Sequence, residues 1–327
     1  MSAPARPAIV VAGDALVDLT PTETVRGTTA YEPHPGGSCL NVAVGLGRLD
    51  VPTAFLARIS TDHFGDLLRQ HLIESGVLTS HLIPTSDLTT LAAVHLVDGQ
   101  ATYSFHAAQA ADRGLLPEHL HELPDGGALP PGAALHLGSI ALVLEPVAST
   151  LEGLLQRESR HRLTSLDPNV RPSLIPDRTA YLRRLQGWVE LVDVLKVSAE
   201  DLAWLYPDEP EADVVARWLD AGVALVLVTS GADGARASTL SATAQVPAPK
   251  VEVVDTVGAG DAFMSGALAH LHDQGLLTRQ AVAALDSEQL AELLRAAAAV
   301  AAYTCTRPGA DPPRRAELVM GAGARRA

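Results

Sequence analysis

The stretch Asp255-Thr-Val-Gly-Ala-Gly-Asp-Ala-Phe263 combines two glycines with a carboxylate, just before an apolar run that predicts a helix over about residues 261–272. Glycine lets backbone approach a bound group closely, and the first N–H groups of a helix attract anions. A carboxylate beside such an anion site can accept the proton of an attacking hydroxyl, and the helix dipole should keep Asp261 ionised for that task. Taken alone, the stretch is read equally well as an aspartate that caps a helix after a glycine turn. The backbone groups that could stabilise a phosphate during its transfer belong to Gly258, Ala259 and Gly260.

A second glycine-rich stretch, Pro35-Gly-Gly-Ser-Cys-Leu-Asn41, also precedes an apolar helical pattern. Gly36 and Gly37 would let a ligand approach the backbone, and Asn41 offers both a donor and an acceptor. A loop with a polar helix cap is the alternative interpretation. Neither stretch is a Walker P-loop, because the pair Gly-Lys does not occur in the chain.

Two further segments carry polar groups directly after apolar runs. Thr229-Ser-Gly-Ala-Asp-Gly234 offers hydroxyls and glycine N–H groups that suit a nucleotide, although an ordinary hairpin turn would look the same. Asp167-Pro-Asn-Val-Arg171 ends in an arginine that could clamp phosphate oxygens, or form a surface salt bridge instead.

The elements that must position these residues follow from the apolar pattern. Helical periodicity is expected at residues 41–49, 64–75, 147–160, 178–191, 213–221 and 288–304. Short apolar runs predict buried strands at residues 8–12, 54–59, 134–137, 163–167, 192–197 and 225–229. Strands alternating with helices indicate an α/β fold with a mainly parallel sheet, which binds ligands at the carboxyl ends of its strands. The residues expected to converge there are Asp14, Asp18, Asp167, Asn169, Arg171, Lys196, Ser198, Thr229 and Gly231.

Two segments break this alternation, at about residues 14–35 and 90–110. The first is polar and β-branched, and the second reads as two strands around Asp98-Gly99, a favoured hairpin turn. Both could form a small sheet that projects from the main one. With no linker in view, residues 1–327 are expected to form a single domain.

Composition excludes several classes of partner. The net charge of −14 argues against nucleic acid or an anionic membrane as the main partner. Two cysteines, Cys39 in an expected loop and Cys305 at an expected helix end, argue for a reducing, cytoplasmic location. Neither a signal peptide nor a stretch long enough to span a bilayer is predicted. The histidine pairs have poor spacing for a transition metal.

Together, the stretches at 35–41 and 255–263 closely resemble the two characteristic motifs of the PfkB/ribokinase family of sugar kinases, in the same order and spacing. The resemblance extends from Gly13-Asp14 to Arg307-Pro-Gly-Ala310, and is strongest to the bacterial fructokinase branch. It implies a three-layer ribokinase-like α/β fold, whose mainly parallel central sheet is flanked by helices and carries a small β-sheet lid. It also implies ATP-dependent phosphorylation of the primary hydroxyl of a small sugar, with fructose as the first choice.

The resemblance further assigns roles to individual residues. It implies that Asp261 is the general base and that the backbone of residues 258–260 forms the anion hole. It also implies that Arg171 contacts the transferred phosphate. The sugar would be bound by Asp14, Asp18, Gly36, Gly37, Asn41, Phe105 and Asn169. The ATP site with its Mg²⁺ would be lined by Lys196, Ser198, Glu200, Asp201, Thr229, Gly231, Gly234 and Ala298. Asp201 would hold the magnesium through water, and Asp255 with the 307–310 loop would hold a monovalent cation, usually potassium. Lid sheets in this family often pair between subunits, so a homodimer is a further expectation.

The chain departs from the family pattern near the sugar. The segment at 105–111 lacks the polar pattern expected of a fructokinase, and Cys39 stands where proline or alanine is frequent. Kinases of 2-keto-3-deoxygluconate, ribose or a nucleoside therefore stay open as alternatives, as does a sugar-binding regulator on the same fold. A 2-keto acid would need extra cationic groups near the lid, where only Arg113 is available.

Overall fold

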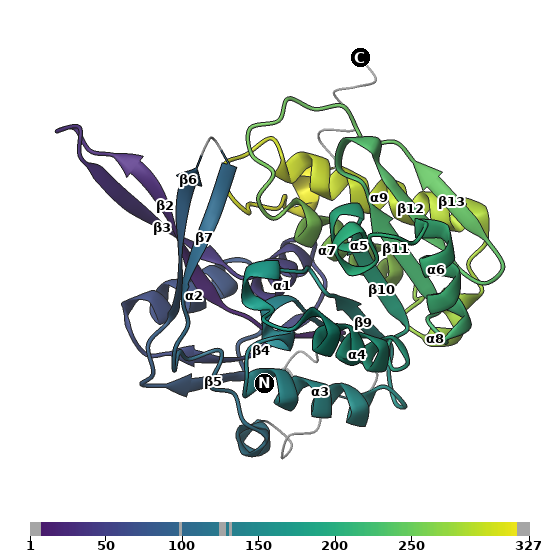
Figure 1. The fold of residues 1–327 in the computed structure, drawn as a ribbon, viewed down its shortest axis with the longest axis horizontal. Helices are drawn as coiled ribbons and strands as arrows, with labels where there is room; N and C mark the ends of the chain where they lie inside the picture. The colour runs from purple at the N-terminus through teal and green to yellow at the C-terminus, as the bar shows by residue number, and fades with distance from the viewer. Residues whose placement is uncertain (1–7, 98–99, 124–128, 131–132, 319–327) are drawn as a thin grey trace.

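The computed structural model describes residues 8–97, 100–123, 129–130 and 133–318, and its core is one large sheet (Figure 1). The six apolar runs predicted as strands all form strands of this sheet. Seven neighbouring strands run parallel, while the last two continue the sheet antiparallel at one edge. From edge to edge the order is β13 (Thr243–Val246), β12 (Ala235–Ser238), β11 (Leu225–Thr229), β10 (Val194–Ser198), β9 (Thr164–Asp167), β8 (Ala134–Gly138), β1 (Ile9–Ala12), β4 (Thr53–Ser60) and β5 (Leu82–Thr85).

Helices cover both faces of this sheet, which makes three layers. Successive side chains of a strand point to opposite faces, so Val11 packs in the core on one face and Val10 in the core on the other. The first face is covered by α1 (Ser38–Arg48), α2 (His63–Glu74), α7 (Ala259–Asp273), α8 (Arg279–Ala283) and α9 (Ser287–Thr304). The second is covered by α3 (Val147–Glu158), α4 (Arg178–Val189), α5 (Ala199–Leu205) and α6 (Glu211–Asp220).

A small separate sheet stands beside the central one, as expected. Its order is β3 (Thr29–Gly36), β2 (Leu16–Glu23), β6 (Thr90–Val97) and β7 (Gln100–His106). The β2–β3 hairpin extends far beyond the body of the molecule (Figure 1). The predicted turn at residues 98–99 lies outside the described residues. Because β2 begins only four residues after β1 ends, this sheet starts at the carboxyl end of a central strand.

The structure also departs from the sequence prediction in places. The hairpin of β12 and β13 was not predicted, because these strands have only four residues each and β13 is half-exposed. The helix α1 begins at Ser38, so Cys39 lies in its first turn and is buried, not in a loop as expected. Within the described ranges, no helix has both the length and the apolar character needed to cross a bilayer.

Candidate active site

Two cavities meet at the loop that leads into α7. The larger has a volume of about 660 Å³ and is lined in part by Ala259 and Gly260. The smaller has a volume of about 90 Å³ and is lined in part by Gly258 and Asp261. One turn of chain therefore borders both spaces, with its carboxylate on the side of the smaller one.

The carboxylate of Asp261 is buried and held by three side chains from other elements. Its Oδ1 accepts hydrogen bonds from Ser38 Oγ at 2.7 Å and from Asn169 Nδ2 at 3.5 Å. Its Oδ2 accepts a hydrogen bond from Asn41 Nδ2 at 2.9 Å. Burial raises the pKa of Asp261 to about 6, against the opposing effects of Asn41, Ser38 and Lys196. The helix dipole was expected to favour the ionised form, but burial has the larger effect on this pKa. The carboxylate is still mostly ionised at neutral pH.

The loop before Asp261 is shaped by a close neighbour. Gly258 has a φ of 73°, and a Cβ added to it would lie 2.5 Å from the Cβ of Ala310. The side chain of Asp255 fixes the same neighbourhood, because it accepts hydrogen bonds from the backbone N–H groups of Val257 at 3.0 Å and Gly309 at 2.7 Å. The loop at 258–260, here called the anion loop, and the 307–310 loop are thus held together.

The smaller cavity contains the carboxylates that follow β1. Asp14 accepts hydrogen bonds from the backbone N–H groups of Ser38 at 2.8 Å and Cys39 at 3.2 Å, which fixes the start of α1. Gly37 has a φ of 105°, and a Cβ added to it would lie only 2.7 Å from the carbonyl oxygen of Asp14. Gly36 similarly packs against the carboxylate of Asp18, because a Cβ added to Gly36 would lie 2.2 Å from Oδ2 of Asp18.

The charge of the smaller cavity is negative overall. Asp14, Asp18 and Asp261 line it, with Arg171 as the cation among its lining residues. Burial raises the pKa of Asp14. Burial and the charge of Asp14 raise the pKa of Asp18 to about 6, although Arg171 acts in the opposite direction. An apolar wall completes the cavity and includes Leu16, Phe105 and Ile140.

The segment after β9 brings Arg171 to this cavity and Asn169 to the residues that line it. Asn169 has a φ of 38°, and its side-chain amide donates to Ser38 Oγ at 2.9 Å. Arg171 Nη1 donates to Asn169 Oδ1 at 2.7 Å and to the carbonyl of Val170 at 3.1 Å. The guanidinium is therefore oriented by its own loop.

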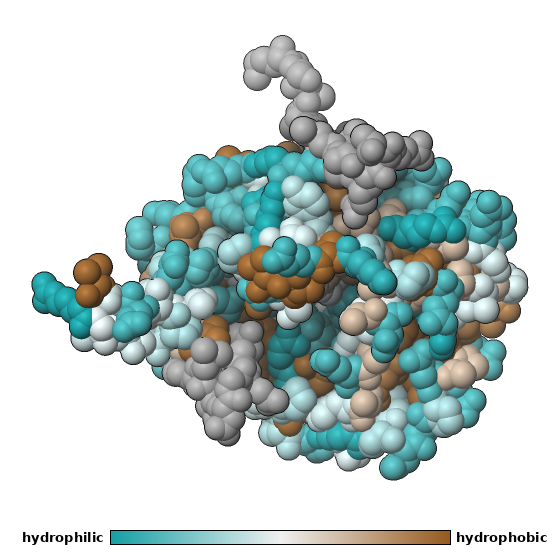
Figure 2. All heavy atoms as spheres, turned by 90° about the horizontal axis from the view of Figure 1, so that it is seen from above, coloured by the Kyte–Doolittle hydropathy of each residue, from teal (hydrophilic) through white to brown (hydrophobic). Residues whose placement is uncertain are grey.

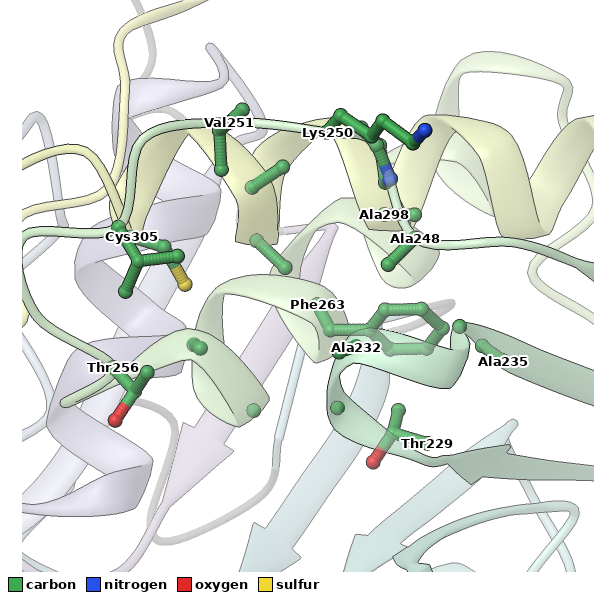
Figure 3. A pocket seen from close by; sticks show the side chains of 18 residues that line it. Thr229, Ala232, Ala235, Ala248, Lys250, Val251, Thr256, Phe263, Ala298 and Cys305 are labelled. Carbon is green, nitrogen blue, oxygen red and sulfur yellow. The ribbon is translucent and has the colours of Figure 1, made fainter.

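The larger cavity is lined mainly by apolar side chains from three elements (Figure 3). Ala298 and Cys305 come from the last turns of α9 and its end, Phe263 comes from α7, and Ala248 and Val251 come from the segment after β13. Thr229 at the end of β11 lies on the opposite side, and the amino group of Lys250 points away from the cavity (Figure 3). Gly231 and Gly234 complete the lining next to Thr229.

The segment between β13 and α7 exposes its own apolar side chains, at Val253, Val254 and Val257. Figure 2 shows the molecule from above, with a hydrophobic patch beside a hollow near the middle of this face. Val253 lines the larger cavity and Val257 the smaller one, so this segment runs past both.

Four residues expected in the nucleotide site, Lys196, Ser198, Glu200 and Asp201, line neither cavity. Lys196 forms a buried ion pair with Asp167 beneath the anion loop. The carboxylate of Asp201 accepts hydrogen bonds from the backbone N–H groups of Val170 at 2.9 Å and Ser198 at 3.1 Å, so it ties the 167–171 segment to the start of α5. Glu200 beside it is exposed.

Several residues that line the cavities were not predicted from the sequence, among them Ser38, Ser139, Lys250 and Val251. Ser38 lies inside the first motif, but nothing in its local sequence distinguishes it from its neighbours. Ser139 follows β8 directly, a position that the strand-end rule could have included. Lys250 and Val251 lie in a segment without helical or strand periodicity, so no sequence signal placed them.

The comparisons with known proteins agree with this geometry. The model of the pfkB family carbohydrate kinases matches residues 6–316. A fructokinase of Rhizobium leguminosarum bv. trifolii is 40% identical over 282 residues, which are 86% of this chain and 85% of that protein. Among solved structures, the fructokinase of Xylella fastidiosa with bound ATP superimposes with a TM-score of 0.86 at 30% identity, covering 96% of this chain and 98% of that one.

A further structural neighbour is the fructokinase of Vibrio cholerae O395. Its form with fructose, ADP and calcium ion gives a TM-score of 0.81 at 29% identity, covering 96% of this chain and 98% of that one. A double mutant of the same enzyme is known with fructose, ADP and potassium ion. A family match over almost the whole chain, added to a glycine loop and carboxylate between two cavities, leads to one conclusion: this chain belongs to the pfkB family of carbohydrate kinases.

Proposed function

We propose that this sugar kinase transfers the γ-phosphoryl group of ATP to the primary hydroxyl of a small neutral sugar, with fructose as the acceptor. The observation that carries the proposal is the position of residues 258–261 between the two cavities. A sugar in the smaller cavity and a nucleotide in the larger one would meet at this turn. There, a carboxylate faces the alcohol and backbone N–H groups face the phosphate.

In this proposal Asp261 is the general base. It takes the proton of the attacking hydroxyl while the N–H groups of Gly258, Ala259 and Gly260 stabilise the charge on the phosphoryl group. A pKa of about 6 suits the task, because the carboxylate is ionised at neutral pH yet more basic than an ordinary aspartate. Arg171, already oriented at the cavity, would contact the transferred phosphate.

The charge of the smaller cavity favours a neutral polyol over a sugar acid. Three carboxylates and one guanidinium line it, so an anionic 2-keto acid would meet net repulsion. The cation considered for such an acid, Arg113, instead donates from Nε to the carbonyl of Glu145 at 2.7 Å. Carboxylate and amide groups of Asp14, Asp18, Asn41 and Asn169 suit the hydroxyls of a sugar, while Phe105 offers an apolar contact. The relatives with 40% identity and with bound fructose are both named fructokinases, which supports fructose itself.

ATP would occupy the larger cavity, as the ATP-bound neighbour suggests. Its volume of about 660 Å³ lies in the range of small-molecule sites. Thr229, Gly231 and Gly234 would receive the phosphates or ribose. Ala298 and the apolar wall around it would receive the base. Lys196 would act from beneath the loop, since its Nζ would be 3.1 Å from a Cβ on Gly260.

Magnesium would arrive with ATP. Mg²⁺ keeps several waters and binds through one or two carboxylates plus substrate phosphates, so it needs no dedicated cage. This agrees with the finding that no group of three metal-ligating side chains occurs in the part of the chain that the structure describes. Ser198 positions Asp201, and Asp201 with Glu200 would hold that hydrated ion. Bound magnesium would neutralise charge on the phosphates.

Asp255 would hold a monovalent cation with the loop at 307–310. Its carboxylate already joins that loop to the anion loop through Gly309, and oxygen ligands suit potassium. The small sheet would close over the sugar as a lid and exclude water. Strands β3 and β7 are the outer strands of this sheet, and lid sheets in this family often pair between subunits. A homodimer through the lid sheet is therefore part of the proposal, testable by light scattering.

The test combines a substrate panel with one substitution. ADP release from ATP is measured with fructose, ribose, 2-keto-3-deoxygluconate and a nucleoside, and fructose should give the highest kcat/KM. Asp261→Asn should then lower kcat about 10²–10⁴-fold with little change in the KM for the sugar. Turnover near that of the wild type in this variant would refute the role of Asp261. Binding of a sugar without turnover would favour a regulator.

A further inference from the structure

The hydroxyl of Ser38 has no role in the function proposed so far, yet it contacts the central carboxylate directly. Ser38 is the first residue of α1 and is only 7% exposed. Its Oγ donates to Asp261 Oδ1 at 2.7 Å, a shorter distance than that of the bond from Asn41. The two residues are 223 positions apart in the sequence, so the contact is made only by the fold.

The hydrogen bonds around Ser38 run in one direction. Asn169 Nδ2 donates to Ser38 Oγ at 2.9 Å, and Ser38 Oγ donates its single proton to Asp261 Oδ1. A hydroxyl has one proton to donate and can accept two hydrogen bonds. Because Ser38 uses its one proton toward Oδ1 of Asp261, that oxygen must be the acceptor. A proton on Oδ1 of Asp261 would oppose the bond from Ser38. The arrangement therefore fits the ionised carboxylate.

The backbone of Ser38 is fixed at the same time. Its N–H donates to Asp14 Oδ2 at 2.8 Å, so the residue joins two carboxylates of the smaller cavity, one through its backbone and one through its side chain. With Asn41 on Oδ2, both oxygens of Asp261 are oriented. Ser38 and Asn169 use the two acceptor sites of Oδ1, and Oδ2 keeps a lone pair for an alcohol.

We infer that Ser38 is a positioning residue for phosphoryl transfer: its hydroxyl holds Asp261 in the ionised form and in the orientation that accepts the proton of the sugar. This inference rests on the proposed role of Asp261 as general base. It adds to that role a residue of the 35–41 stretch to which neither the motif nor the proposed function gave a task.

Other charged groups also act on Asp261 and do not replace Ser38. Lys196 and Asp167 face it from β10 and β9, and their charges oppose each other. Asp14, Asp18 and Arg171 share the cavity with it. Among these groups none donates a hydrogen bond to Oδ1, which receives its donors from Ser38 and Asn169.

The test is the pH dependence of the first turnover, measured by rapid quench at saturating ATP and fructose, so that product release does not enter. Loss of a hydrogen bond to a charged acceptor should move the acid-side midpoint of Ser38→Ala up by about one pH unit. Relative to the wild type, the variant should then lose about fivefold in rate at pH 6 and much less at pH 8.5. Ser38→Thr, which restores a hydroxyl, should return the midpoint to that of the wild type.

The matched control is Ser265→Ala on α7. Ser265 is also a buried serine, but its Oγ donates to the carbonyl of Ala262 at 2.8 Å and not to the carboxylate of Asp261, so its removal should leave the midpoint unchanged. An unchanged midpoint in Ser38→Ala, or a shifted midpoint that a folded Ser38→Thr fails to restore, would overturn the inference.

If Ser38→Thr does not fold, as loss of its melting transition would show, Asn169→Ala is measured in its place. A midpoint shift in the Ser38→Ala/Asn169→Ala double variant that equals the sum of the two single shifts would also overturn the inference. Asp261→Asn distinguishes failure of the proposed function from failure of this inference. Activity retained in that variant would contradict the role of Asp261 as general base, not only its positioning by Ser38.

Discussion

The ammonium group of Lys196 forms an ion pair with the carboxylate of Asp167 directly beneath the anion loop, and their side chains are only 4% and 1% exposed. Such a pair has lost its hydration, so each charge depends on the other. Lys196 also approaches Gly260, which means that the pair supports the loop from below. The proposed function would therefore couple stability and catalysis at this position.

Removal of one partner should be more harmful than removal of both. Lys196→Met leaves Asp167 buried and unpaired, and should lower the free energy of unfolding by about 3–5 kcal/mol. The double variant Lys196→Met/Asp167→Asn should be more stable than either single variant, as chemical denaturation can measure. If Lys196 acted only on ATP, its substitution would raise the KM for ATP without this loss of stability.

The conformation of Gly258 gives a second prediction. Gly258→Ala would require a Cβ at a φ of 73° and within 2.5 Å of Ala310, so the anion loop must shift. The displacement should lower kcat about 100-fold, a loss comparable to removing one donor from an oxyanion hole, with little change in the KM for the sugar.

Gly275 provides the matched control for this substitution. It has a φ of 69°, but a Cβ added to it would have no atom within 4 Å. Gly275→Ala therefore introduces the same backbone strain without a steric conflict, and should cost about 1 kcal/mol of stability without a kinetic effect. Equal losses of kcat in the two variants would contradict the steric explanation.

The fold was predictable where physical signals are local. Continuous apolar runs indicated the buried parallel strands, because strands covered on both faces need apolar residues on both sides. The two glycine motifs predicted close approach of backbone to a ligand, which stays a prediction. Gly258 and Gly37 adopt positive φ, a conformation that favours glycine. Asp261 could be singled out for the same reason, since it follows the anion loop directly.

The remaining features depend on contacts between distant residues. Nothing near Ser38 indicates that its hydroxyl meets Asp261, and nothing near Asp201 indicates that its carboxylate meets the N–H of Val170. For the same reason, the helix dipole alone was a poor guide to the pKa of Asp261. Burial among residues from three other segments decides its pKa, and a sequence does not show burial of that kind.

Asp18 should be a source of instability at neutral pH. Its pKa of about 6 in the folded protein exceeds the ordinary value of 3.8, so the folded state binds this proton more tightly than the unfolded chain. The resulting stabilisation is complete below pH 3.8 and is lost as the pH rises through 6. The carboxylate of Asp18 accepts no hydrogen bond from any of the described residues, so Asp18→Asn removes the charge without breaking such a bond.

Asp18→Asn should therefore be more stable than the wild type at pH 7, by about 1–2 kcal/mol after allowance for solvent screening. The difference should largely disappear at about pH 4, where Asp18 is protonated in the folded wild type and close to half protonated in the unfolded chain. Denaturant unfolding at the two pH values measures it. A variant that is equally or less stable at pH 7 would show that Asp18 is compensated, for example by Arg171.

Activity should depend on a monovalent cation through Asp255. At constant ionic strength, replacing sodium by potassium should raise kcat of the wild type, and Asp255→Ala should lose this activation. The carboxylate also tethers Gly309, so the variant should be slower in either salt. A wild-type rate that is the same in both salts would remove the cation site from the proposal, and leave Asp255 with the tethering role alone.

The proposed position of the nucleotide base in the larger cavity can be tested by filling that part of the cavity. Ala298 lines the larger cavity on α9, and a leucine there would occupy space that a nucleotide base needs. Ala298→Leu should raise the KM for ATP by at least about tenfold, since an overfilled pocket costs about 1–3 kcal/mol, and leave the KM for the sugar unchanged. Ala299→Leu is the matched control, because residue 299 is exposed on the same helix and lines neither cavity. If both variants bind ATP like the wild type, the nucleotide does not reach α9. If both lose affinity for the sugar as well, the change has spread through α7, against which α9 packs, and the two cavities are not independent.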